Sequence, residues 1–191
     1  MTKVATQGIR GSYSSVAAFK AFGDALELIE CASFEGVFQA MASGLATHSV
    51  LPVRNSIVGK IGATNRLIRN HRPKTLGEVD VRVEHVLAAM PGTRFEDLDS
   101  VRSHSEAMRQ CSKFLDDNPQ LRPIIGFDTA SCIRSVVHDE LSGQAAICSR
   151  EATEIYGGEV IKENIADSKD NRTTFSILSS ELQTRKRVTR R

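Results

Sequence analysis

Short apolar segments alternate with helix-forming segments along the first seventy residues, and loops rich in serine and glycine separate them. The apolar runs predict strands at Lys3–Gln7, Leu26–Cys31 and His48–Val53, and the segments between and after them predict helices at Ala17–Phe22, Phe34–Met41 and Ala63–Asn70. Ser14 or Ser15 is expected to cap the first helix and Ser33 the second; further along the chain, Thr129 is expected to cap the helix that ends at His138, and Ser149 the helix that begins at Arg150. Such alternation is typical of an α/β protein with a mostly parallel sheet covered by helices.

The second half repeats this alternation after a break at residues 70–77. We expect strands at Val79–Met90, Pro123–Phe127, Gln144–Cys148 and Arg172–Leu178, and helices at Ser105–Leu115, Thr129–His138 and Arg150–Tyr156. The pattern predicts two small α/β lobes with a ligand cleft between them. Lobe one takes about residues 1–76 plus the C-terminal strand, and lobe two takes about residues 77–170.

The composition excludes several other classes of protein. Of the 191 residues, 40% are hydrophobic and 25% are charged, which argues against a disordered chain. The longest uncharged stretch, 36–53, contains polar residues and Pro52, so no membrane span or membrane partner is expected. The N-terminus shows no signal peptide, and the four cysteines form no CxxC. These features predict reduced thiols and a cytoplasmic location.

Positive charge gathers at the C-terminus, where the last seven residues hold five of the 25 Lys and Arg side chains. We expect residues 184–191 to form a basic, disordered tail. No basic stripe lies elsewhere, and the chain has no Trp and only two Tyr, so no nucleic-acid partner is expected.

Three loops that follow predicted strands contain small hydroxyl or amide side chains. They are Gly11–Ser14, Asn55–Ser56 with Gly59, and Asp128–Ser131. Ligands of open parallel sheets bind beyond the carboxyl ends of the strands, where helix N-termini present N–H donors, so these loops suit an anionic small molecule. The alternative is that each hydroxyl is only a helix cap. The five histidines lack metal-ligand spacing, and His104 is a candidate general acid or base with a structural role as the alternative.

In these loops and two further segments the chain resembles the catalytic domain of prephenate dehydratases. Residues 8–18 are similar to the family's GxxG[TS][FY]S…AA, residues 51–59 to VPIENSxxG, residues 103–111 to SHPQALxQC, residues 128–131 to [DS]TAxA, and residues 156–175 to YG…ENIxD…NxTRF. The resemblance covers nearly the whole chain and implies one catalytic domain, 1–183, with two α/β lobes like those of periplasmic binding proteins.

The resemblance implies a lyase of phenylalanine biosynthesis that converts prephenate to phenylpyruvate with loss of carbon dioxide and water. It implies a catalytic role for Thr173 and no metal or organic cofactor. Substrate contacts are expected from nine residues: Ser12, Ser14, Arg54, Asn55, Ser56, Thr129, Ala130, Arg172 and Phe175. Homodimers or homotetramers are expected. The chain ends soon after Leu178, so the C-terminal ACT domain of many family members is expected to be absent.

Two positions depart from these motifs: Arg54 stands where the family has glutamate, and Thr174 where it has arginine. We hypothesise that Arg54 or Arg172 supplies the missing positive charge to the substrate; neutral drift is the alternative. Thr174 gives some weight to a non-aromatising prephenate decarboxylase, whereas Thr173 and the Asn55–Ser56 pair favour dehydration. A non-catalytic carboxylate-binding protein is a third possibility, and the choice between prephenate and its amino counterpart arogenate stays open.

Overall fold

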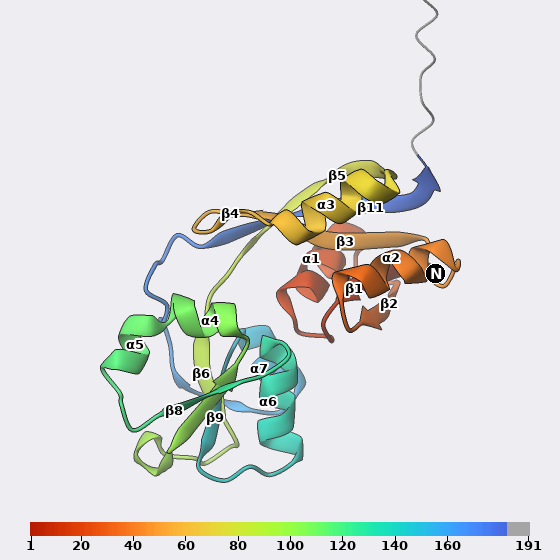
Figure 1. Cartoon of the computed structure of the whole chain (residues 1–191). Helices are drawn as coiled ribbons and strands as arrows, with labels where there is room; N and C mark the ends of the chain where they lie inside the picture. Colours follow the sequence, from red (N-terminus) through yellow and green to blue (C-terminus); the bar gives the residue numbers. More distant parts are fainter. Residues whose placement is uncertain (183–191) are drawn as a thin grey trace, which may run out of the picture.

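Two α/β lobes, joined by two extended segments, make up the computed structural model, which describes residues 1–182 (Figure 1). The chain passes from the first lobe to the second at residues 83–85 and returns at residues 163–171. The two crossing segments lie side by side, because the Val83 amide donates a hydrogen bond to the Asn171 carbonyl (2.8 Å).

The first lobe contains a sheet with strand order β2-β1-β3-β11-β5, and β4 pairs with β3. Its elements are β1 (Thr2–Gln7), α1 (Tyr13–Phe22), β2 (Leu26–Cys31), α2 (Phe34–Ala42), β3 (His48–Asn55), β4 (Gly59–Lys60), α3 (Gly62–His71), β5 (Pro73–Arg82) and β11 (Arg172–Leu182). Strands β2, β1 and β3 are parallel, whereas β11 runs antiparallel to β3 and β5.

The second lobe contains a sheet with strand order β10-β6-β9-β7-β8. Its elements are β6 (Val86–Ala89), a 3₁₀ turn (Phe95–Asp97), β7 (Ser100–Ser103), α4 (Ser105–Gln110), α5 (Ser112–Asp116), β8 (Arg122–Ile125), α6 (Thr129–His138), β9 (Gln144–Cys148), α7 (Arg150–Ile155) and β10 (Glu159–Lys162). Strands β8, β7 and β9 are parallel, and β6 and β10 complete the sheet in antiparallel fashion.

Each sheet buries apolar side chains on both faces, because successive residues of a strand point to opposite sides. In β1, Val4 packs towards α1 and Ala5 towards α2 and α3. In the second lobe, Leu87 packs on the side of α4 and α5, and Ala88 on the side of α6 and α7. Helices therefore cover both faces of each lobe, and the strand ends remain at the cleft.

The predicted two-lobe α/β architecture is confirmed, and each sheet is mixed because the strands nearest the crossings run antiparallel. The single strand expected at Val79–Met90 is wrong, since β5 and β6 belong to different sheets. The crossing therefore lies near residue 83 rather than 76. Pro73 is compatible with a strand here because it is the first residue of β5, an edge strand.

Helix starts and ends differ from the prediction in three further places. Ser12 rather than Ser14 or Ser15 caps α1, and Asp128 rather than Thr129 caps α6. The helix expected at Ser105–Leu115 is interrupted at Cys111. Within residues 1–182 no helix is long and apolar enough to cross a membrane. The expected tail, 184–191, lies outside the described residues.

Candidate active site in the cleft between the lobes

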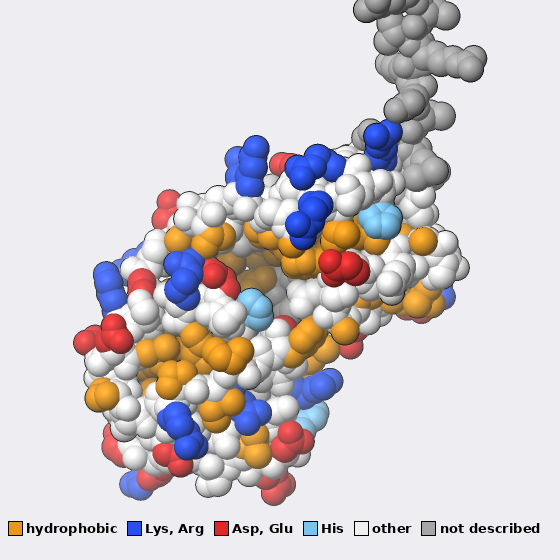
Figure 2. All heavy atoms as spheres, viewed as in Figure 1, with side chains coloured by type: hydrophobic (Ala, Val, Ile, Leu, Met, Phe, Trp, Pro, Cys, Tyr) orange, Lys and Arg blue, Asp and Glu red, His pale blue; other side chains and the backbone are white. Residues whose placement is uncertain are grey.

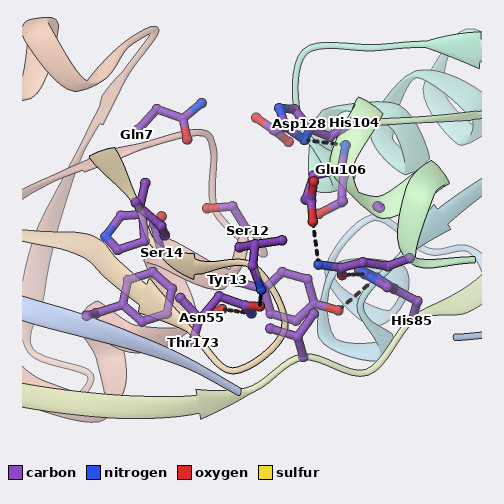
Figure 3. Close-up of a pocket in the computed structure, with 18 residues that line it drawn as sticks. Gln7, Ser12, Tyr13, Ser14, Asn55, His85, His104, Glu106, Asp128 and Thr173 are labelled. Atoms are coloured by element: carbon purple, nitrogen blue, oxygen red, sulfur yellow. Dashed lines mark hydrogen bonds between the residues drawn. The ribbon is translucent and has the colours of Figure 1, made fainter. Parts of the chain in front are cut away.

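A cavity of about 200 Å³ lies between the lobes, where the space-filling surface is hollowed (Figure 2). The first lobe lines it with the start of α1, the end of β3 and the start of β11, and the second lobe with the starts of α4 and α6. The side chains that matter most below are Ser12, Tyr13, Ser14, Asn55, His85, His104, Glu106, Gln110, Asp128, Thr129, Thr173 and Phe175 (Figure 3).

Strand alternation decides which side chains of β11 reach the cavity. Thr173 and Phe175 line it, whereas the Thr174 hydroxyl donates to an Asp80 carboxylate oxygen (2.6 Å) on the other face of the sheet. Strand β3 does not follow simple alternation, because its register against β11 shifts between Pro52 and Arg54. That bulge brings Pro52 and Asn55 to the same side of the strand, and both line the cavity.

The side chain of Asn55 donates a hydrogen bond to the hydroxyl of Thr173. The Asn55 Oδ1 atom accepts from the backbone amides of Ile57 (2.9 Å) and Val58 (3.1 Å), which fixes the orientation of the side-chain amide. Its Nδ2 atom therefore donates to Thr173 Oγ1 (2.9 Å). Because Thr173 Oγ1 accepts in this contact, its own proton is left for another acceptor, and Thr173 lines the cavity.

Two ten-residue helices begin at the cavity. The Ser12 Oγ atom caps α1 by accepting from the Ser15 amide (3.3 Å), and Asp128 Oδ1 caps α6 by accepting from the Ser131 amide (2.6 Å). The first N–H groups of a helix have no partner within it, and the helix dipole favours negative charge there. The ends of α1 and α6 are thus suited to carboxylates.

The charged side chains of the cavity wall are carboxylates. Among the described residues that line it, Glu106 and Asp128 are acidic and none is Lys or Arg. Hydrogen bonds from Arg109 to Glu106 (2.5 and 3.1 Å) hold the pKa of that carboxyl below its ordinary value, against the opposing effect of burial. Burial lowers the pKa of His85, so its imidazole is neutral at neutral pH.

The loop Gly8–Gly11 holds the two lobes together through its backbone. The Ile9 amide donates to Asp128 Oδ2 (3.3 Å), and the carbonyls of Arg10 and Gly11 accept from the hydroxyls of Tyr156 (2.8 Å) and Ser149 (3.0 Å). These contacts cross from α6 and α7 to the first lobe. They fix the separation of the cavity walls in this arrangement.

Six of the ten residues expected at the site line the cavity: Ser12, Ser14, Asn55, Thr129, Thr173 and Phe175. The other four lie outside it. Ser56 Oγ accepts from the Arg172 amide (2.9 Å) and donates to the Asp170 carbonyl (3.0 Å), which closes a turn. Ala130, in α6, is buried in the core beside α7.

The two arginines also lie outside the cavity. The Arg54 guanidinium donates to Thr174 Oγ1 (3.4 Å) on the opposite face, and Arg172 pairs with Asp170 (3.6 Å). Neither guanidinium supplies a cation to the cavity. The hypothesis that one of them replaces a missing substrate contact therefore loses its geometric basis.

The prediction missed Tyr13, His85, Glu106 and Gln110 as lining residues. Three of them stand inside the motif segments 8–18 and 103–111, so the motifs themselves were a usable signal. His85 lies in a crossing segment that was predicted as mid-strand. The candidate His104 lines the cavity and also caps α4, where its Nδ1 accepts from the Glu106 amide (3.2 Å).

No cluster of three or more His, Cys, Asp or Glu side chains with metal-binding geometry occurs within residues 1–182.

Comparison with known proteins gives a consistent family. The family model described as "Prephenate dehydratase" matches residues 4–183. The "Arogenate dehydratase/prephenate dehydratase 2, chloroplastic" of Arabidopsis thaliana is 36% identical over 179 residues, which cover 94% of this chain and 46% of that protein. The chain thus spans about half the length of this curated relative.

Solved structures share the fold over nearly the whole chain. A prephenate dehydratase from Arthrobacter aurescens in complex with L-Phe superposes with a TM-score of 0.82 at 26% identity, covering 94% of this chain and 60% of that one. A protein described as a quorum quenching acylase, GqqA, superposes with a TM-score of 0.81 at 29% identity, covering 95% of this chain and 65% of that one.

Proposed function

The chain belongs to the prephenate dehydratase family, and on that premise we propose that it is a lyase that converts prephenate to phenylpyruvate, with loss of carbon dioxide and water. One observation carries the proposal: Thr173 lines the cavity and its hydroxyl accepts a hydrogen bond from Asn55, which leaves the hydroxyl proton for a ligand. The same step on arogenate gives phenylalanine. Because this chain covers under half of its curated relative, the activity stands here as a proposal.

The reaction needs help chiefly at the leaving oxygen. The electrons of the breaking bond to the ring carboxylate enter the ring, the bond to the ring hydroxyl breaks, and the departing hydroxide takes up a proton and becomes water. Thr173 donates a hydrogen bond to this oxygen as negative charge develops on it. A donor placed where charge develops is worth about 10²–10³-fold in rate. Threonine is too weak an acid to give up its proton outright, so water completes the protonation.

The rest of the cavity holds the substrate. The N-termini of α1 and α6, with the hydroxyls of Ser14 and Thr129, offer donors to carboxylates. Phe175 supplies an apolar wall for the ring. These contacts position the leaving hydroxyl at Thr173.

Arogenate is a second candidate substrate, favoured by the charge of the cavity wall. Arogenate carries an ammonium group where prephenate carries a keto group. The described lining contains Glu106 and Asp128 and no Lys or Arg, so an ammonium group meets opposite charge there. The relative from Arabidopsis thaliana carries both substrates in its name. We expect arogenate to be turned over as well as prephenate, and the ratio of the two kcat/KM values tests the effect of this charge.

The decarboxylase alternative rested on Thr174. Its side chain points to Asp80, away from the cavity, so this departure leaves the lining unchanged. Thr173 and Asn55, which favour dehydration, both line the cavity. These positions support dehydration over decarboxylation alone.

The experiment incubates the purified chain with prephenate or arogenate at neutral pH and follows the products by absorbance and mass. We expect phenylpyruvate or phenylalanine, a loss of about 10²–10³-fold in kcat for Thr173→Val, and partial recovery in Thr173→Ser. Thr174→Val is the matched control, since it removes a hydroxyl from the same strand on the opposite face. Loss of carbon dioxide with the hydroxyl retained would identify a decarboxylase, and binding without turnover a carboxylate-binding protein.

Assembly as a homodimer or homotetramer and a cytoplasmic location stay part of the proposal. Light scattering of the purified chain tests the first, and imaging of the tagged chain in its native cell tests the second.

A further inference from the structure

A line of buried hydrogen bonds runs from Thr173 in the first lobe to Glu106 in the second. Asn55 Nδ2, besides donating to Thr173, donates to Asn171 Oδ1 (2.7 Å). Asn171 Nδ2 donates to Gln110 Oε1 (2.8 Å), and Gln110 Nε2 donates to Glu106 Oε1 (2.9 Å). The line therefore crosses the cleft wall through three side-chain amides, and Figure 3 shows its two ends, with Asn55 and Thr173 on one side and Glu106 on the other.

Each amide in this line has only one orientation that satisfies its neighbours. At the first-lobe end, the amides of Ile57 and Val58 donate to Asn55 Oδ1, so Asn55 must present its NH₂ group to Asn171 and Thr173. Asn171 then accepts through Oδ1 and must donate through Nδ2 to the next residue.

The second-lobe end requires the same direction independently. Glu106 is ionised and bound by Arg109, and an ionised carboxylate only accepts hydrogen bonds. Gln110 must therefore turn its NH₂ group to Glu106 and its Oε1 atom to Asn171. The two ends agree, so every amide is satisfied in one direction and in no other.

Which ring nitrogen of His85 carries the proton depends on the direction of these hydrogen bonds. Its Nε2 atom lies 3.0 Å from Gln110 Oε1, which is an acceptor in this arrangement, so Nε2 must carry the ring proton. Nδ1 is then unprotonated in the neutral ring, and its 3.2 Å contact with the Tyr13 hydroxyl carries no hydrogen bond while that hydroxyl donates its one proton to the Glu84 carbonyl (2.6 Å). If Gln110 were turned over, its NH₂ group would face Nε2 and the other tautomer would form.

We propose that Gln110 and Asn171 are positioning residues: they continue the hydrogen-bond direction of Asn55 across the cleft to Glu106 and so hold Asn55 in place as the donor to Thr173. This inference rests on the proposed function for its effect on catalysis. Neither residue contacts the leaving oxygen; each acts through the next. Because Gln110 belongs to the second lobe and Thr173 to the first, the line is complete only when the lobes are joined as they are here.

The first test does not depend on activity. In the ¹⁵N-labelled chain, the ring nitrogens of His85 are recorded by long-range ¹H–¹⁵N correlation at pH 8. We expect the tautomer protonated at Nε2 in the wild type and loss of that preference in Gln110→Met, which removes the acceptor at similar size. A wild-type ring protonated at Nδ1 would overturn the proposed direction.

The second test reverses one link and then restores it. Gln110→Glu places two carboxylates against each other at the contact now made by Gln110 and Glu106, so one must take up a proton and the direction is lost. In the double variant Glu106→Gln/Gln110→Glu, the new amide donates to the new carboxylate, which still accepts from Asn171. Gln39→Glu, on the exposed face of α2, is the control for the chemical change itself.

We expect kcat of Gln110→Glu to fall by about 10²-fold, the scale for a misplaced reacting group, with KM changed by less than about threefold. The double variant should recover most of this loss, and the His85 tautomer should recover with it. Equal losses in the single and double variants, with melting temperatures that fall in parallel, would show a merely structural role.

The two proposals fail separately. A chain that shows the expected His85 tautomer but turns over neither prephenate nor arogenate refutes the proposed function and keeps the hydrogen-bond direction. An active enzyme in which Gln110→Glu keeps its kcat refutes the positioning role and keeps the function.

Discussion

Gly11→Ala should separate the lobes, because Gly11 touches the second lobe where a side chain has no room. Its φ angle is +87°, in the region that favours glycine. A Cβ atom built there lies 3.0 Å from both Cα and Cβ of Ala152 in α7, and a backbone atom cannot swing aside. Its carbonyl also accepts from Ser149 Oγ, so displacement of the loop breaks a contact between the lobes.

The magnitude follows from a matched control. Gly23→Ala has a similar φ of +75°, with ψ at −176°, but meets nothing within 4 Å, so it measures backbone strain alone, about 1–3 kcal/mol. Gly11→Ala adds overpacking of about 1–3 kcal/mol, for a total loss of about 2–6 kcal/mol in the free energy of unfolding. The difference between the two variants isolates the contact between the lobes.

The assay pairs urea unfolding with steady-state kinetics. Gly11→Ala should also lower kcat/KM by between about 10- and 10²-fold, because Gly11 precedes the Ser12 cap and a shift of about 1 Å misplaces the walls of the cavity. Gly23→Ala should keep its kcat/KM. If the two variants lose equal stability and Gly11→Ala keeps full activity, the loop does not set the separation of the lobes.

Three further predictions follow from the same geometry. Asn55→Ala leaves the Ile57 and Val58 amides and the Thr173 hydroxyl without a partner, and should lower the free energy of unfolding by at least about 2 kcal/mol, read from the urea midpoint at constant slope. The lowered pKa of His85 means that the unfolded chain binds more protons than the folded one between the two pKa values. The contribution of the neutral His85 ring to the free energy of unfolding is therefore full above pH 6.5 and is lost as the pH falls through the pKa of the folded state. Unfolding midpoints should decline from pH 8 to pH 5, and this decline should be weaker in His85→Gln. Burial raises the pKa of the thiols of Cys111 and Cys148 to about 12 and that of Cys132 to about 11, so at pH 7.5 iodoacetamide should label the half-buried Cys31 first in intact-mass spectra, whereas early labelling of a second thiol would contradict the buried placement.

Periodicity and capping residues were sufficient to predict much of the fold. Strands β2 and β9 have the predicted bounds, and Ser33 and Ser149 cap the helices that follow them. The errors arose where a local signal competes with tertiary pairing. Pro73 was taken as part of a break, yet it begins an edge strand held by β11, which lies about a hundred residues further along the chain.

The site was predictable where motifs mark single loops and was not where distant residues combine. Ser12, Asn55 and Thr173 follow from the loops and the resemblance. The link from Gln110 to Asn171 spans 61 residues and depends on the packing of one lobe against the other, which local sequence does not reveal. Arg54 is adjacent to Asn55 in β3 and therefore points to the opposite face, where its partner Thr174 comes from the distant strand β11.

The two departures from the family motifs, at positions 54 and 174, occur at one place in the fold. Strand β11 pairs Thr174 directly with Arg54 in β3 and with Asp80 in β5. The Arg54 guanidinium donates to Thr174, and Thr174 donates to Asp80. Where the motifs put a glutamate at position 54 and an arginine at position 174, this chain has one arginine, one threonine and the neighbouring carboxylate of Asp80.

This row of side chains therefore still contains one cation and one anion, although the cation has moved from β11 to β3. Opposite charges and hydroxyls placed across neighbouring strands stabilise a sheet, whereas like charges placed directly opposite destabilise it. Arg54 with an arginine at position 174 would be such a like-charged pair, so the two changes are compatible only together. Because the row lies on the face away from Thr173, the exchange alters the support of the catalytic strand and leaves the chemistry of the cavity untouched.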